Sequence, residues 1–365
     1  MGEPNVIRFA EKVILLLDQG EFTATYKYAV LLGLMDLCLE RSERDGSPPD
    51  VLTTDQLARK AIELYWRQSQ RFAPLHDRIP LQNRRGQAEI LTLITRFREQ
   101  HAPDPNSTLF RAKLHDPERF EQLVREVEWK LVEMPLPKLQ RVGRELDPFI
   151  YDISWDDQIR RRMFKSREFD NRIRFQPGAS RCLVALAGVL RPLVHRHWAT
   201  RVTQLNSLQE SGLDEFLFGA DRSALRPVCP PLLELQGGRC FYCAGRIQAK
   251  PQVDHFLPWA RCPDDGLANL VVAHDACNRQ KSDFLADAGH VASWVERAVH
   301  HAQGLGEVAA NACWPHDPQR TSSVVRSIYR RLPDDMRLWH LEQKFVPIDR
   351  ARLTAALTLL PDLAS

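Results

Sequence analysis

Two pairs of metal-binding side chains stand out in the last third of the chain. Cys240 and Cys243 form the first pair, and His274 and Cys277 form the second. Structural zinc sites commonly take their ligands in such pairs, each pair from one tight turn. Four protein ligands close the coordination sphere, so this zinc would stabilise structure rather than activate water. The alternative, a set of buried free cysteines beside an unrelated histidine, is disfavoured by the spacing of both pairs.

Between the two pairs lies a sequence suited to hydrolysis, Asp254 followed by His255, on a short predicted strand that ends at Pro258. Neighbouring side chains on a strand face opposite sides, so one can bind a metal while the other faces a nucleophilic water. Histidine suits the role of general base, and a carboxylate suits Mg²⁺. Asn278 directly follows Cys277 and begins a helical stretch that can aim its side-chain oxygen at the same metal.

From about Gln236 to Asp287 the sequence resembles the zinc-bearing ββα-metal module of the HNH endonuclease family. The resemblance implies that His255 is the general base and that Asp254 binds a catalytic Mg²⁺ or Mn²⁺. It also implies that Asn278 is the second protein ligand of that ion. The chain departs from the usual pattern at one point, because His274 stands where the second zinc pair normally has a cysteine. Histidine also ligates zinc well, so the Zn²⁺ site is still expected.

Two further roles follow from the same resemblance. Asn269 matches the middle asparagine of the motif, which braces the loop that holds the histidine. Lys281 matches a frequent basic residue on the helix, and it is expected, together with Arg279, to contact phosphate. The implied reaction is hydrolysis of a phosphodiester that leaves a 5′ phosphate and a 3′ hydroxyl.

A basic segment upstream is a second candidate for nucleic-acid binding. Residues 159–174 hold seven basic and two acidic residues, with phenylalanines between them. Basic side chains neutralise phosphates, and aromatic rings can stack on bases. The alternative is a solvated face whose phenylalanines pack in the core. The main candidate contacts are Arg160, Arg161, Arg162, Lys165 and Arg167, and lesser ones are Arg222, Arg226 and Arg239.

The overall composition is that of a soluble globular protein, with 44% hydrophobic and 27% charged residues. A chain of 365 residues can hold two domains. The eight cysteines are scattered apart from the zinc ligands, which argues against a disulfide framework. The apolar run near the N-terminus is too short for a membrane span and lacks a cleavage-like end. A cytoplasmic protein that does not associate with membranes is therefore expected.

The fold is predicted to be mainly α. We expect a helical domain over residues 1–206, the zinc-containing ββα-metal module over 207–290, and a helical segment over 291–365 that packs on the module. In the first domain, Thr53 and Gln56 form a capping box that begins a helix. Pro192 is expected to kink or split the apolar helix over 180–206. Further helices are expected over 6–17, 26–40, 86–99 and 116–133.

The sequence therefore predicts a metal-dependent DNA endonuclease. The order of the domains resembles bacterial proteins that defend against foreign DNA, which implies other subunits of a defence system as partners. Two other functions stay open. One is a non-cleaving zinc module that binds nucleic acid, although such a module has no need for Asp254, His255 and Asn278. The other is a ribonuclease, for which the aromatic content of 8% offers few rings to stack on single-stranded RNA.

Overall fold

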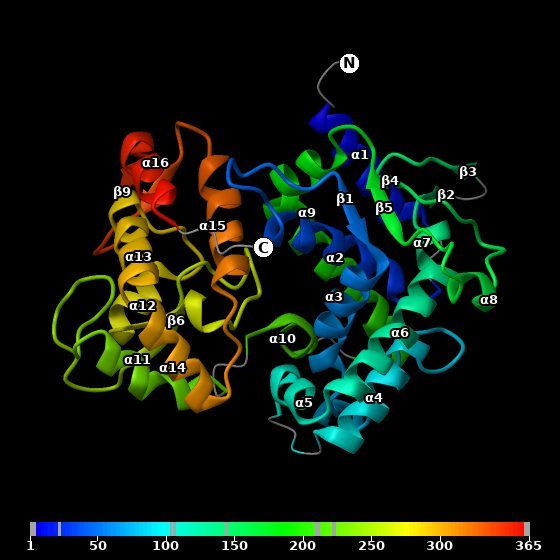
Figure 1. Cartoon of the computed structure of the whole chain (residues 1–365), viewed down its shortest axis with the longest axis horizontal. Helices are drawn as coiled ribbons and strands as arrows, with labels where there is room; N and C mark the ends of the chain where they lie inside the picture. Colours follow the sequence, from blue (N-terminus) through cyan, green and yellow to red (C-terminus); the bar gives the residue numbers. More distant parts are fainter. Residues whose placement is uncertain are drawn as a thin grey trace. The chain divides into compact units, whose positions relative to one another are not determined.

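The structure, a computed structural model, describes residues 5–20, 23–102, 104, 107–142, 145–208, 212–220 and 224–360 (Figure 1). The chain divides into two compact units. Unit 1 comprises Met1–Cys38 and Pro48–Gly219, and unit 2 comprises Leu39–Ser47 and Ala220–Ser365. No helix within these described ranges is long and apolar enough to cross a membrane.

Unit 1 consists of helices and a small sheet. The sheet is antiparallel and has the strand order β1 (Val51–Thr53), β5 (Arg172–Phe175), β4 (Tyr151–Asp152). A separate two-stranded ribbon pairs β2 (Arg141–Val142) with β3 (Glu145–Leu146). The helices are α1 (Val6–Gln19), α2 (Tyr26–Glu40), α3 (Thr54–Trp66), α4 (Glu89–His101), α5 (Leu109–His115), α6 (Pro117–Glu133), α7 (Pro135–Lys138), α8 (Arg161–Phe164), α9 (Ala179–Asn206) and α10 (Leu213–Phe218).

Local sequence explains where several of these helices begin. Thr53 and Gln56 make the predicted capping box at the start of α3. Asp116 caps α6, and Pro117 occupies its first turn. Pro192 was expected to kink or split its helix, but α9 runs unbroken through it. The carbonyl that Pro192 leaves without an N–H partner belongs to Gly188, which is exposed, so water can satisfy it.

Unit 1 ends at Gly219, and its last helix, α10, packs on α9. The ring of Phe218 stacks on that of His195 at 4.0 Å between centroids and meets Trp198 edge-on at 5.5 Å. Burial and the nearby Arg191 charge lower the pKa of His195 to about 3, so this histidine is a neutral packing residue.

Unit 2 contains a β-hairpin followed by a helix. Strand β6 (Gln252–His255) pairs antiparallel with β7 (Leu270–Ala273), and Asp254 lies opposite Val271. The next helix, α12 (Asp275–Lys281), begins directly after β7. This ββα order and the helical content of both units confirm the predicted fold class. The other elements are α11 (Cys229–Leu235), α13 (Ala288–His300), α14 (Ala302–Ala312), α15 (Pro318–Arg330), β8 (Arg337–Trp339), β9 (Phe345–Pro347) and α16 (Arg350–Thr358).

The core of unit 2 lies beneath the hairpin. Leu270 and Val272 of β7 pack in one cluster with Leu232 of α11, Leu305 of α14 and Trp314. All four residues of β7 are buried, and helix α11 packs against this strand. The hairpin is therefore a rigid base for the side chains that β6 carries.

One buried cation fixes the backbone at the start of β7. Arg297 of α13 donates to the carbonyl oxygens of Ala268, at 2.7 Å, and Leu270, at 2.6 Å. Trp294 donates to the same Ala268 oxygen at 3.0 Å. Burial lowers the pKa of Arg297 to about 10, so the guanidinium is still charged at neutral pH. Helix α13 thus holds the backbone on either side of Asn269.

We predict that Arg297→Met lowers the free energy of unfolding by about 2–4 kcal/mol, because it removes the side-chain donor to the buried Leu270 carbonyl and one of the two donors to the Ala268 carbonyl. Urea unfolding followed by tryptophan fluorescence measures this loss. Arg279→Met is the matched control, since that side chain is 73% exposed. Equal stability of the two variants would contradict the role given to Arg297.

Candidate functional site

The first predicted ligand pair lies in a tight turn before β6. Gly237 and Gly238 adopt left-handed backbone angles, with φ of 63° and 71°, which a residue with a Cβ rarely takes. The turn then closes through a hydrogen bond from the Cys240 N–H to the Gly245 carbonyl at 2.9 Å. Cys240 and Cys243 thereby face the start of α12, where His274 is the N-cap residue and Cys277 lies in the first turn.

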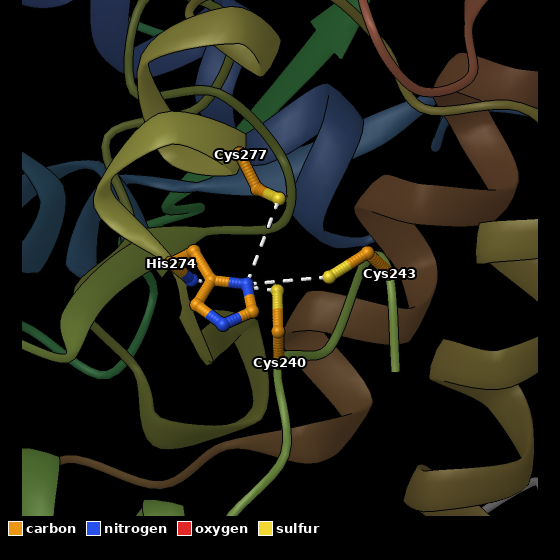
Figure 2. Close-up of side chains that lie close together, drawn as sticks. All are labelled: Cys240, Cys243, His274 and Cys277. Carbon is orange, nitrogen blue, oxygen red and sulfur yellow. Dashed lines mark hydrogen bonds between the residues drawn. The ribbon is translucent and has the colours of Figure 1, made fainter. Parts of the chain in front are cut away.

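The four side chains converge on a common centre (Figure 2). Their ligand atoms all lie within 4.8 Å of one another. The Nδ1 atom of His274 is 3.2 Å from Cys243 Sγ and 3.9 Å from Cys277 Sγ. Its other ring nitrogen, Nε2, is 3.2 Å from the Arg246 carbonyl oxygen, which assigns the proton to Nε2 and leaves Nδ1 as the ligand. Three sulfurs and one nitrogen in this geometry could hold zinc.

The electrostatics of the cluster also favour a bound cation. Burial and the neighbouring Cys240 and Cys243 raise the pKa of the Cys277 thiol to about 12. Three thiolates therefore repel one another in the absence of a positive charge. A zinc ion would offset this repulsion and hold all three sulfurs deprotonated.

Asp254 and His255, on β6, have different neighbours. The Oδ2 atom of Asp254 accepts a hydrogen bond from Tyr242 Oη at 2.6 Å and lies 3.1 Å from Lys281 Nζ. Burial and the Asp254 carboxylate raise the pKa of Tyr242 well above its ordinary value, so Tyr242 is a neutral donor. The ring of His255 is largely buried, and its Nε2 atom lies 2.8 Å from Asp265 Oδ1.

Lys281 was expected to contact phosphate, and that prediction is wrong for this structure. Its side chain is fully buried, with the ammonium donating to the His255 carbonyl at 2.7 Å and pairing with Asp254. The Lys281 ammonium is therefore not accessible to a phosphate. A buried charge needs a partner of opposite sign, and here Lys281 joins α12 to β6.

Asn269 is fully buried and hydrogen-bonds both ends of the loop that follows His255. Its Oδ1 accepts from the Leu257 N–H at 2.8 Å, and its Nδ2 donates to the carbonyl of Asp264 at 3.0 Å. A further contact joins Nδ2 to the Leu257 carbonyl at 3.3 Å. Both the oxygen and the nitrogen of the Asn269 amide are therefore hydrogen-bonded, and they join the two ends of the loop from Leu257 to Asp264.

Asn278 lies one helical turn before Lys281, on the side of α12 that faces β6. It is half-buried, and its side-chain amide makes no hydrogen bond with any described residue. Arg279, next along the helix, points to solvent and pairs with Asp275 at 2.9 Å. The Asn278 amide therefore has no hydrogen-bond partner within the described residues, whereas Arg279 is a surface residue.

In unit 1, the basic segment divides into exposed cations and packed rings. Phe164 packs on Trp129, at 5.5 Å between ring centroids, and Phe169 packs on Trp155, at 5.1 Å. Both rings are half-buried and contact other rings of the protein, which favours the alternative of packed phenylalanines. The predicted basic contacts are all exposed: Arg160, Arg161, Arg162, Lys165 and Arg167. Arg226 and Arg239 in unit 2 are also exposed, and Arg222 lies outside the described residues.

Sequence reasoning missed two residues that touch the site, Tyr242 and Asp265. Tyr242 stands between the zinc ligands Cys240 and Cys243, where an apolar packing residue would serve equally well. Asp265 belongs to a polar loop whose composition is typical of a turn. The position of neither residue in the sequence indicates which side chain it contacts, because both contacts form only when the loops fold.

A second group of ligand-type side chains, Asp287, His290 and His340, has an ordinary structural explanation. Asp287 caps α13 by accepting from the His290 N–H at 2.9 Å, and its other oxygen lies 2.6 Å from His340 Nδ1. Both carboxylate oxygens are in use, and the positive end of the helix dipole disfavours a cation there. This group therefore belongs to the helix cap.

We predict that Cys243→Ser releases zinc and lowers the melting temperature by roughly 5 °C or more, because zinc binding contributes directly to folding in such sites. Metal analysis of the purified chain and thermal unfolding measure the two effects. Cys313→Ser is the matched control, since Cys313 is an exposed free cysteine. Full zinc retention in Cys243→Ser would contradict the assignment of this ligand.

Comparison with known proteins bears directly on this part of unit 2. Residues 240–286 match the family model described as HNH endonuclease. A search of curated proteins gave no match, and a search of solved structures gave none either. The matched residues contain all four converging zinc-type ligands and the ββα element that carries Asp254, His255 and Asn278. The predicted resemblance is confirmed, and the chain carries an HNH endonuclease module over residues 240–286.

Proposed function

We propose that this chain is a metal-dependent endonuclease that hydrolyses phosphodiester bonds in DNA. The proposal is supported by three polar groups on the ββα element that could bind a metal or accept a proton and that have no hydrogen-bond partner in the described residues. Asp254 Oδ1, His255 Nδ1 and the Asn278 side-chain amide make no hydrogen bond within the described part of the chain. A module that only binds nucleic acid has no use for such a set.

Asp254 and Asn278 would hold the catalytic ion. Their free oxygens are hard donors of the kind that Mg²⁺ and Mn²⁺ prefer. Lys281 and Tyr242 occupy only Oδ2 of Asp254, which leaves Oδ1 for the metal. A bound divalent ion would neutralise the charge that develops on the scissile phosphate and on the leaving oxygen.

His255 would act as the general base. Its Nδ1 would accept a proton from water, and the electron pair of the broken O–H bond would form the new bond to phosphorus. The bond from phosphorus to the 3′ oxygen then breaks, and that oxygen takes a proton from solvent. A single site of this kind cuts one strand in each event, so a double-strand break needs two events or two copies.

DNA is the proposed substrate because the basic segment of unit 1 offers cations without exposed rings. The phenylalanines of that segment are packed within the protein. This arrangement supports contacts with the phosphate backbone rather than stacking on single-stranded bases. Action in bacterial defence together with other subunits is proposed from the order of the domains alone, and a ribonuclease remains the alternative outcome of the assay below.

We predict that the full chain with Mg²⁺ or Mn²⁺ cuts supercoiled plasmid, and that His255→Ala lowers the rate at least about 100-fold, because general-base catalysis is lost. Circular dichroism and zinc content should stay unchanged. His300→Ala, an exposed histidine on α13, is the matched control. Cutting by His255→Ala at the wild-type rate would overturn the role of His255, and cutting of RNA alone would change the substrate.

Asn278→Ala is the cleaner test of the metal ligands. Removing the Asp254 carboxylate would leave the buried Lys281 ammonium without its partner, which alone destabilises a protein. Asn278 has no such partner, so its loss should act on metal binding alone. We expect Asn278→Ala to need a higher Mn²⁺ concentration for half-maximal cutting. An unchanged metal requirement would remove Asn278 from the site.

For the basic segment, we predict that changing Arg160, Arg162 and Lys165 together to Gln weakens DNA binding and lowers the salt dependence of binding by about 0.9 for each lost phosphate contact. Fluorescence anisotropy at several salt concentrations measures both effects. Replacing Arg78, Arg84 and Arg85, which are also exposed, by Gln makes the same change in net charge. Equal effects from the two triple variants would mean that net charge, not this segment, controls binding.

A further inference from the structure

We propose that Asp265 is a positioning residue for His255, and that the two side chains work as a carboxylate–imidazole pair. Asp265 Oδ1 lies 2.8 Å from His255 Nε2. An ionised carboxylate can only accept a hydrogen bond, so Nε2 must carry the proton. In the neutral ring the lone pair then lies on Nδ1, which has no partner within the described residues. The pair therefore selects the tautomer in which Nδ1 can accept a proton.

The backbone around Asp265 is held in place from several directions. Trp314 donates from Nε1 to the Asp265 carbonyl at 2.6 Å. The neighbouring Asp264 carboxylate accepts from Thr321 Oγ1 at 3.0 Å and from the Gly266 N–H at 2.9 Å. Asn269 Nδ2 donates to the Asp264 carbonyl at 3.0 Å. Although the Asp265 side chain is 35% exposed, its main chain is anchored on both sides, so the carboxylate has a defined position.

This anchoring gives the C-terminal part of unit 2 a role in the site. Trp314 precedes α15, and Thr321 lies in its first turn. The Leu267 N–H also donates to the Pro315 carbonyl at 2.8 Å. These contacts join the loop that carries Asp265 to residues 314–321, which lie beyond the segment that matches the family model. The module thus depends on the following helices to orient its histidine.

Among the other charged groups near His255 in the described part of the chain, none can replace Asp265. Lys281 binds the main-chain oxygen of His255 and not its ring. Asp254 is occupied by Lys281 and Tyr242 through Oδ2. Asp264 uses both of its carboxylate oxygens within the loop and with Thr321. The ring of Trp259 lies 5.2 Å from that of His255 and carries no charge. Asp265 is therefore the group that faces the imidazolium formed when His255 accepts a proton.

The assignment of the tautomer can be tested without any nuclease activity. In the full chain with ¹⁵N-labelled histidine, long-range ¹H–¹⁵N spectra distinguish a ring protonated at Nε2 from one protonated at Nδ1. The spectrum of His255→Ala identifies the His255 signals among the 12 histidines. We expect the Nε2-protonated form in the wild type and a mixture of tautomers in Asp265→Ala. The same tautomer distribution in both proteins would overturn the proposal.

The catalytic consequence rests on the proposed function and is tested separately. Asp265→Ala should lower the cleavage rate at saturating DNA by about 10- to 100-fold, as is typical when the partner that orients a reactive side chain is removed. The affinity for DNA should stay within about twofold, because Asp265 only orients the base and does not bind the substrate. Asp265→Asn keeps an acceptor oxygen but loses the charge, so its rate should fall between those of the wild type and Asp265→Ala.

Asp283→Ala is the matched control, because it removes an exposed carboxylate from the same module. A rate loss in Asp283→Ala equal to that in Asp265→Ala would overturn the proposal, since the charge alone would then explain both. If the wild type cuts no nucleic acid, the proposed function fails, while the spectra still decide whether Asp265 orients His255.

Discussion

The geometry of the module depends on one buried cation, the Lys281 ammonium. Its side chain is fully buried, yet it touches both a carboxylate of β6 and a main-chain carbonyl of the same strand. A charge in such a position is tolerated only when it is paired and hydrogen-bonded, so α12 can take only one position against the hairpin. Asn278 lies one helical turn before Lys281, so the same contact also limits where its side chain can lie relative to β6.

The remaining contacts fix the two ends of the same element. At one end, the cysteine and histidine cluster holds the start of α12, and Asn278 follows a member of that cluster directly in sequence. At the other end, Arg297 and Asn269 hold the main chain at the start of β7 and the loop after His255. The zinc-type cluster after β7 and His255 at the end of β6 therefore lie at opposite ends of the hairpin, whereas Asn278 directly follows the cluster residue Cys277.

The sequence predicted the ligand pairs and the ββα order because both depend on local spacing. Paired ligands in tight turns and a capping box such as that of Thr53 are read over a few residues. The predicted phosphate contact of Lys281 was wrong, since no neighbouring residue in the sequence indicates that its ammonium is buried against β6. The expected kink or split at Pro192 was also wrong, because exposed Gly188 lets water satisfy the freed carbonyl. The contact of Asp265 with His255 was not predicted, because it depends on a loop that is held by Trp314 and Thr321, far along the sequence.

We propose that two kinds of metal site, one closed and one open, share this hairpin and helix. Anomalous diffraction from crystals soaked in Mn²⁺, recorded at the zinc and manganese edges, tests it most directly. We expect zinc among Cys240, Cys243, His274 and Cys277, and manganese bound by Asp254 Oδ1 and Asn278. Manganese bound by Asp265 instead, or zinc bound by Asp254, would contradict it.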